Sequence, residues 1–111
     1  MLKNAAKVKL LPATMRWATT TFRVNALNDE LRNALVMWRD HIRDAHPDIK
    51  EVRCYSSNGG TEIVWQEGFV DFHAYQRLIE QEDDRCESVM GQVFRHSVPG
   101  TRTGRIMNDV F

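Results

Sequence analysis

The sequence has few of the residues and patterns from which an activity is usually inferred. Among its 111 residues, Cys54 and Cys86 are the only cysteines, and they form no Cys-x-x-Cys pair. They therefore supply neither a zinc-binding set nor a disulfide framework. Fifteen Lys and Arg residues balance fifteen Asp and Glu residues. Because nucleic-acid-binding domains and proteins that bind anionic membranes normally carry a basic surface, we expect neither nucleic acid nor a membrane as partner.

Long apolar runs are also missing. No stretch of about 18 apolar residues is present, which argues against a membrane-spanning helix. Lys3, Lys7 and Lys9 precede Leu10 and Leu11, but the apolar stretch of at least about seven residues that a secretory signal needs does not follow them. We interpret residues 1–13 as an irregular basic arm, and we expect a cytoplasmic protein whose thiols are reduced and buried.

A predicted β-hairpin occupies the middle of the chain. Two strand-like segments, Ile49–Ser57 and Thr61–Phe69, flank the turn Asn58-Gly59-Gly60. Asparagine and glycine tolerate the positive φ that tight hairpin turns require. On the second strand, Glu67 shares a face with the apolar side chains of Ile63, Trp65 and Phe69. Glu67 is also placed to pair with Arg53 across the hairpin.

Helical patterns lie on both sides of this hairpin. Apolar residues at spacings of three and four predict a helix that begins after Asn28 and ends at His46-Pro47. A second helical pattern begins after Asp71 and continues to Phe94, with charged residues at 81–85. An unbroken helix of about 25 residues would be about 37 Å long, whereas strands of about nine residues span about 30 Å. We therefore expect a break near residues 81–85.

The outermost strands are predicted at residues 14–24 and 101–110, so the element order is β-α-β-β-α-β. This order predicts an α+β, ferredoxin-like sandwich, in which residues 14–111 form a single domain with both helices on one face of a four-stranded antiparallel sheet. The other face would then carry a mixed apolar and charged surface, and an apolar patch of this kind favours association with a second copy. The candidates on this face are Met15, Trp17, Tyr55, Val64 and Met107, mixed with Arg23, Glu51, Arg53, Glu62 and Arg105.

Several segments resemble the dimeric α/β-barrel superfamily. They are the helix that contains Trp38 and ends at His46-Pro47, the turn Asn58-Gly59-Gly60, the segment Trp65-Gln66-Glu67-Gly68-Phe69 and the helix start Asp71-Phe72-His73-Ala74-Tyr75. The superfamily includes cofactor-free antibiotic-biosynthesis monooxygenases, haem-degrading enzymes, polyketide cyclases and stress-responsive proteins. The first strand lacks the histidine frequent in the stress-responsive branch, and the Asn, Trp and His set of the haem-degrading branch is not matched.

The resemblance implies a homodimer with a small-molecule pocket between the helices and the sheet of each subunit. It also implies a cofactor-independent monooxygenase or cyclase that acts on an aromatic or polyketide-like compound. The alternative is a non-catalytic, stress-associated or ligand-binding dimer. The candidate catalytic residues are His41 and Tyr75, and the candidate substrate-binding residues are Trp38, Trp65 and Glu82.

Each of these residues also has a structural interpretation. His41 lies at the edge of an apolar helix face, and the tryptophans are suited to filling a core as well as to lining a flat ligand. Glu82 is either an acid that faces a cavity or part of a solvated acidic segment. No two histidines have the His-x-x-x-His spacing that places two ligands on one helix face, so we expect no metal site and no cofactor.

Overall fold

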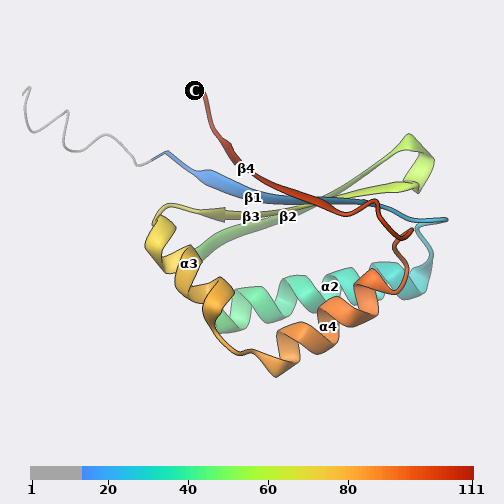
Figure 1. Cartoon of the computed structure of the whole chain (residues 1–111), viewed down its shortest axis with the longest axis horizontal. Coiled ribbons are helices and arrows are strands. Elements are labelled where there is room, and N and C mark those ends of the chain that lie inside the picture. The colour runs from blue at the N-terminus through green and yellow to red at the C-terminus, as the bar shows by residue number, and fades with distance from the viewer. Residues whose placement is uncertain (1–13) are drawn as a thin grey trace, which may run out of the picture.

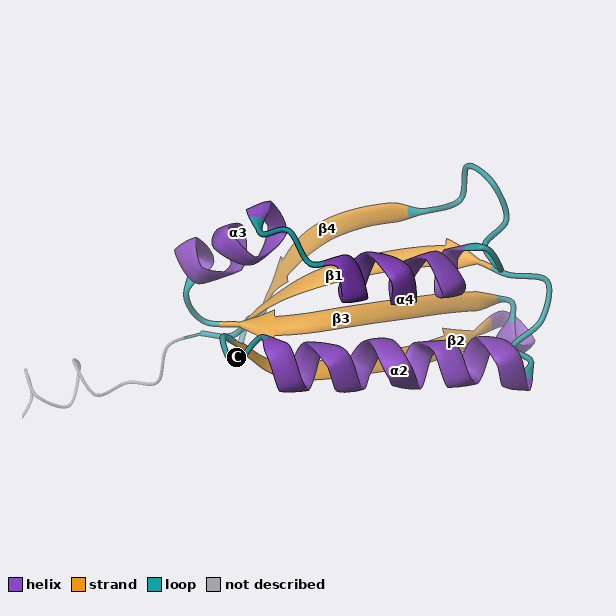
Figure 2. Ribbon diagram, turned by 90° about the horizontal axis from the view of Figure 1, so that it is seen from below, coloured by secondary structure: helices purple, strands orange, loops and turns teal. Residues whose placement is uncertain are grey.

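A computed structural model describes residues 14–111 (Figures 1 and 2), so the predicted arm at residues 1–13 lies outside the described residues. The elements follow one another in the predicted order, β-α-β-β-α-β, with the last helical region divided in two. They are β1 (Arg16–Arg23), α2 (Asp29–Ala45), β2 (Ile49–Ser57), the single 3-10 turn η1 (Asn58–Gly60), β3 (Glu62–Phe69), α3 (Phe72–Glu80), α4 (Asp84–Phe94) and β4 (Thr103–Asn108).

The four strands form one antiparallel sheet in the order β2-β3-β1-β4. Helices α2, α3 and α4 lie on one side of this sheet, and the described residues leave its other side uncovered (Figure 1). Both observations confirm the α+β, ferredoxin-like architecture expected from the sequence. None of the described helices is long and apolar enough to span a membrane.

Helix α2 begins and ends where its capping residues predict. The Asn28 side chain accepts a hydrogen bond from the backbone N–H of Leu31 at 2.9 Å, which satisfies a donor that the first turn would otherwise leave free. At the other end, the backbone N–H of His46 donates to the Ile42 carbonyl at 2.9 Å, and Pro47 follows. The buried face of α2 consists of Leu31, Ala34, Leu35, Trp38 and Ile42.

The expected break in the last helical region is present. Helix α3 ends at Glu80 and α4 begins at Asp84. Asp83 caps the new helix, since its Oδ1 accepts a hydrogen bond from the backbone N–H of Cys86 at 2.9 Å. The break turns the chain so that α3 and α4 follow different parts of the sheet (Figure 2), and it places Asp83 close to the end of α2.

The hairpin turn is built from three consecutive residues with positive φ. The values are 54° for Asn58, 69° for Gly59 and 88° for Gly60. A side chain with a Cβ is strained in this region, and asparagine and glycine tolerate it best. The turn therefore confirms the hairpin predicted from these three residues.

The hydrophobic core lies between the sheet and the helices. Apolar side chains from β1 and β3 pack against the inner faces of α2 and α4, and the largest fully buried ones are Trp65, Phe22, Phe69, Leu31, Ile42, Ile63, Val89 and Val93. Two sequence expectations about this part of the protein are wrong. Cys54 is exposed rather than buried, and Arg53 pairs with Glu51 at 2.9 Å rather than with Glu67. Glu67 faces the helices, whereas Arg53 lies on the opposite face of the sheet, where its register partner is Gln66.

The uncovered face carries the residues expected there. Trp17 pairs in register with Gly68 and Met107, and Val64 pairs with Thr21 and Tyr55, so these side chains share one face. Tyr55 and Met107 are exposed, but Trp17 is only 6% exposed. Its ring lies across Gly68 with the Arg53 guanidinium 4.2 Å from the ring centroid, and its indole N–H donates to Asp109 at 3.0 Å.

Candidate functional site

A cavity of about 440 Å³ lies between the helices and the sheet. Its volume falls within the range of about 300–1,000 Å³ that is typical of small-molecule sites. Aromatic, aliphatic and sulfur-containing side chains form about half of its wall, and polar or charged side chains form the rest. The lining residues are Thr20, Trp38, Ile42, His46, Glu67, Tyr75, Leu78, Ile79, Gln81, Asp83, Cys86, Glu87, Met90, Phe94 and Arg102.

Glu67 is the carboxyl group of the cavity whose pKa is raised by burial. It lies on β3, whose alternation places it on the same face as Trp65 and Phe69. Its Oε2 atom is buried and has no hydrogen-bond partner among residues 14–111. Burial raises the pKa of Glu67 to about 7, and the indole of Trp65 offsets this effect only in part. Near neutral pH this carboxyl can therefore take up or release a proton.

Tyr75 lies beside Glu67 in the wall of the cavity. Its ring stacks on Phe69, with centroids 4.4 Å apart and planes 7° apart. Burial and the charge of Glu67 raise the pKa of Tyr75 to about 12, so that its hydroxyl stays protonated at neutral pH and can donate a hydrogen bond. Burial also raises the pKa of the Cys86 thiol, to about 11, which keeps this thiol in its non-nucleophilic form.

Trp38 provides a flat part of the cavity wall. Its ring stacks on Trp65, with centroids 3.7 Å apart, and Phe94 contacts it edge-on at 5.7 Å. The indole nitrogens of Trp38 and Trp65 are both buried without a hydrogen-bond partner in the described part of the chain. Since buried polar groups are nearly always hydrogen-bonded, the two such atoms whose residues line the cavity, Nε1 of Trp38 and Oε2 of Glu67, indicate a place for polar atoms of a ligand or water.

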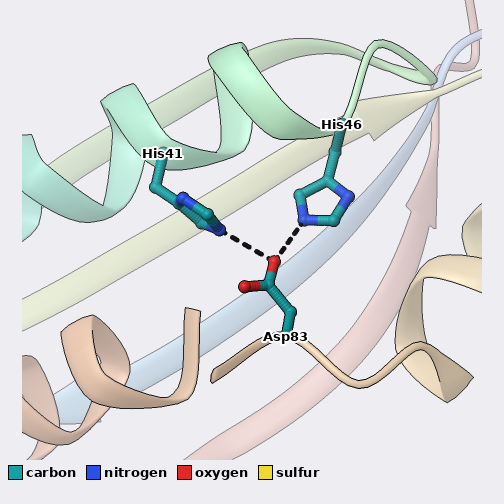
Figure 3. Close-up of side chains that lie close together, drawn as sticks. All are labelled: His41, His46 and Asp83. Atoms are coloured by element: carbon teal, nitrogen blue, oxygen red, sulfur yellow. Dashed lines mark hydrogen bonds and ion pairs between the residues drawn. The ribbon is translucent and has the colours of Figure 1, made fainter. Parts of the chain in front are cut away.

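Two histidines and one aspartate meet at the border of the same cavity (Figure 3). The Nε2 atom of His41 lies 2.8 Å from Oδ2 of Asp83, and Nε2 of His46 lies 2.7 Å from the same oxygen. His41 and His46 come from the end of α2, and Asp83 comes from the segment between α3 and α4. The hydrogen bond from His41 is the main cause that holds the pKa of Asp83 well below its usual range.

The residues proposed from the sequence are distributed unevenly around this site. Tyr75 and Trp38 line the cavity, whereas His41 contributes through Asp83 and is not part of the lining. Trp65 is buried behind Trp38 and borders a second hollow between α2 and β2. Glu82 is exposed and does not line the cavity, although its neighbours Gln81 and Asp83 in the break between α3 and α4 do.

Sequence reasoning missed Glu67, Asp83 and the proximity of the two histidines. A signal for Glu67 was available, since it is the one carboxylate on an otherwise apolar strand face. The spacing rule for metal ligands applies to two residues on one face of a helix. It could not find the pair of His41 and His46, because His46 lies just past the end of α2. His41 and Asp83 are 42 residues apart in sequence, so their contact depends on the packing of the helices.

No family model and no curated protein sequence matches this chain. Solved structures of the same fold are nevertheless similar to it. A monooxygenase of Streptomyces coelicolor in complex with nanaomycin D matches with a TM-score of 0.64 and 16% identity, covering 88% of this chain and 89% of that one. The cofactor-independent oxygenase SnoaB of Streptomyces nogalater matches with a TM-score of 0.64 and 11% identity, covering 89% of this chain and 94% of that one.

A third structure is a dimeric ferredoxin-like protein of unknown function from Jannaschia sp.. Its TM-score is 0.64 at 12% identity, and the match covers 84% of this chain and 97% of that one. At these identities the likeness shows the fold alone. The resemblance inferred from the sequence is thus confirmed at the level of the fold, which monooxygenases and dimeric proteins of unknown function share.

Proposed function

We propose that this protein binds a small, largely apolar aromatic molecule in the cavity between the helices and the sheet, and that Glu67 removes a proton from it. The observation that carries this proposal is the Glu67 carboxyl, which is buried in the cavity wall with one unpartnered oxygen. A general base works best when its pKa lies near the working pH, and the pKa of Glu67 is about 7.

The other residues of the cavity suit a substrate that becomes an anion when it loses its proton. The Trp38 ring offers a flat apolar surface for an aromatic or polyketide-like compound. The protonated Tyr75 hydroxyl can donate a hydrogen bond to an oxygen on which negative charge develops. Loss of the proton to Glu67 would leave a delocalised carbanion or enolate, and this proton transfer needs no cofactor. Such an anion can then react with dioxygen or close a ring.

Two of the structurally similar proteins are oxygenases, one of them described as cofactor-independent, which supports this class of chemistry. We assign no proton-transfer role to His41, because His41 does not line the cavity and its Nε2 is hydrogen-bonded to Asp83. We assign the role of the base to Glu67 instead, and Tyr75 keeps a role as a hydrogen-bond donor.

We also propose that two copies associate through the uncovered face of the sheet. Similarity to a dimeric ferredoxin-like protein supports the association of two copies, and the choice of face rests on the side chains exposed there. The exposed side chains of Tyr55 and Met107 on that face would be removed from water by a second copy. The association would leave the cavity free, because the cavity lies on the helix side of the sheet.

A ligand screen followed by a matched variant tests the function. Quinones, flavonoids, fatty acids and haem are screened by thermal shift, since a compound that binds only the folded state raises the melting temperature. Hydroxylated naphthalenes and anthrones are then tested for dioxygen uptake. We expect Glu67→Gln to keep the thermal shift and to lower turnover at least about 100-fold, as loss of a general base does. Glu82→Gln is the control and should behave as the wild type.

Two results would count against the proposal. Equal turnover in the Glu67→Gln and wild-type proteins would remove Glu67 from the reaction. A thermal shift without turnover of any bound compound would favour the alternative, a ligand-binding dimer without catalysis. If no compound of these classes shifts the melting temperature, binding of an apolar aromatic molecule in this cavity is wrong.

A further inference from the structure

We infer that His41, His46 and Asp83 form a binding site for one divalent first-row transition-metal ion at the border of the cavity. Each residue offers one ligand atom, and these three atoms lie within 4.8 Å of one another. Two imidazole nitrogens and one carboxylate oxygen are ligands that Zn²⁺ and its neighbours in the first transition row accept, whereas Mg²⁺ and Ca²⁺ prefer oxygen atoms alone. This inference is independent of the proton transfer proposed for Glu67.

Binding of a metal ion requires the Asp83 carboxylate to move back from the two histidine nitrogens, because its Oδ2 now lies where the ion would bind. In a site with metal–ligand bonds of about 2.0–2.2 Å, neighbouring ligand atoms lie roughly 3.0–3.5 Å apart. Here Oδ2 of Asp83 lies 2.8 Å from Nε2 of His41 and 2.7 Å from Nε2 of His46. An ion bound to all three atoms therefore needs Oδ2 farther from both nitrogens than it lies here, and it needs the two nitrogens, which lie within 4.8 Å of each other, at the same spacing of about 3.0–3.5 Å.

Backbone groups hold two of the three ligand residues, Asp83 and His46, in place. Oδ1 of Asp83 accepts the backbone N–H of Cys86 at 2.9 Å, which fixes the carboxylate and leaves Oδ2 directed at the histidines. His46 is held by its backbone N–H to the Ile42 carbonyl and by its own carbonyl, which accepts the Ile49 N–H at 3.0 Å. The bond to Oδ1 orients the Asp83 carboxylate itself, whereas the bonds of His46 fix its backbone; a carboxylate oriented in this way loses less conformational freedom when it binds a metal ion.

The site is accessible, and its geometry leaves coordination positions open. The side chains of His41 and Asp83 retain 16% and 17% of their exposure, so an ion can enter from solvent. His46 and Asp83 also line the cavity. Three protein ligands leave at least one position for water or for an oxygen atom of a molecule in the cavity, which is the arrangement of catalytic rather than structural metal sites. The expectation of no metal site came from the cysteine pattern and from the spacing of histidines along a helix, and neither detects ligands that tertiary packing brings together.

Direct metal titration of the tag-free full chain tests the inference. Zn²⁺ binding is measured by isothermal titration calorimetry at pH 7.5, and Co²⁺ binding by its visible absorption, with Mg²⁺ as the negative control. We expect one Zn²⁺ per chain with micromolar affinity or better, and a Co²⁺ spectrum typical of nitrogen and oxygen ligands. Mg²⁺ should neither bind at the same concentrations nor displace Zn²⁺.

Matched variants locate the ion. Asp83→Asn keeps an oxygen that can cap α4 but removes the anionic ligand, and His46→Gln removes one imidazole; each should weaken Zn²⁺ binding at least tenfold. His73→Gln changes an exposed histidine of α3 and should leave Zn²⁺ binding unchanged. Circular dichroism checks that every variant is folded.

Two results would overturn the inference. The first is Zn²⁺ affinity that is the same in folded Asp83→Asn and in the wild type. The second is a wild-type protein that binds no Zn²⁺ and whose ¹⁵N spectra show both histidines protonated at Nε2. In that case the three residues form only a hydrogen-bonded contact between α2 and the segment before α4. A variant that fails to fold is replaced by His41→Gln, for which the same tenfold loss is expected.

Discussion

The indole rings of Trp38 and Trp65 lie parallel, with centroids 3.7 Å apart and planes 3° apart. This contact joins the middle of α2 to the middle of β3, and Phe94 of α4 closes it edge-on against Trp38. Because Trp38 also lines the cavity, the same ring contributes to the stability of the fold and to the shape of the site. The two contributions can be separated by substitution.

We expect Trp38→Ala and Trp65→Ala each to lower the free energy of unfolding by about 3–5 kcal/mol, as truncation of a buried aromatic side chain does. The rings also interact directly, so the double variant should lose less than the sum of the single losses, by about 0.5–1.5 kcal/mol. Urea unfolding followed by circular dichroism measures all four proteins. Strict additivity would show that the stacking contributes nothing beyond the burial of each ring.

Glu67 should make stability fall as pH rises from about 4.5 to about 7. Its pKa is about 7 in the folded protein and near 4.5 when it is free of the fold, so between these values the folded state holds a proton that the unfolded state has lost. The contribution of Glu67 to the free energy of unfolding is therefore highest below about pH 4.5. It declines between about pH 4.5 and pH 7 and is constant above pH 7. The whole decline is at most about 3 kcal/mol.

Glu67→Gln removes this dependence, because the amide has no charge to desolvate. We expect the variant to be more stable than the wild type above pH 7, and the difference to vanish near pH 4. Urea unfolding at a series of pH values measures it, and Glu82→Gln, an exposed substitution, is the control. A difference between Glu67→Gln and the wild type that does not change with pH would show that the carboxyl is not desolvated.

The sequence predicted the elements well because each depends on local patterns. The Asn28 and Asp71 caps, Pro47 and the turn at Asn58-Gly59-Gly60 determine their own positions, and the structure has the corresponding boundaries within a few residues. The charged segment at 81–85 predicted the break because a single helix would be longer than the sheet. The contacts between elements could be predicted from the sequence only in part.

The site was less predictable because it depends on which buried groups meet. Glu67 was assigned to a pair with Arg53, although its apolar neighbours on the strand placed it in the core. Asp83 lies in an acidic segment, where the sequence does not distinguish it from its neighbours. Its contact with His41 and His46 forms only when α2 packs beside the start of α4. Trp17 shares the predicted face with Val64, but its burial against Gly68 follows from the pairing of β1 with β3.

A charge on the uncovered face should prevent the proposed association. Val64 lies on that face and is half-buried, so Val64→Glu would place a carboxylate in the middle of a paired sheet without disturbing the core. We expect light scattering at micromolar concentration to show a dimer for the wild type and a monomer for this variant. Val36→Glu, at an exposed position of α2, is the matched control and should remain dimeric. A wild-type monomer, or a dimeric Val64→Glu protein, would exclude this interface.

Gly68 is required by the ring of Trp17 rather than by its own backbone conformation. A Cβ at Gly68 would lie 2.9 Å from Cζ3 of Trp17, closer than such atoms approach in proteins, and the ring is held in place by Arg53 and Asp109. We therefore expect Gly68→Ala to lower the free energy of unfolding by about 1–3 kcal/mol, the usual cost of overpacking. Gly104→Ala is the control on β4, since a Cβ there meets nothing closer than 3.9 Å. Urea unfolding compares the two variants, and the additional substitution Trp17→Leu should restore much of the loss in Gly68→Ala by removing the colliding ring. If Gly68→Ala and Gly104→Ala lose the same stability, the Trp17 ring does not constrain position 68.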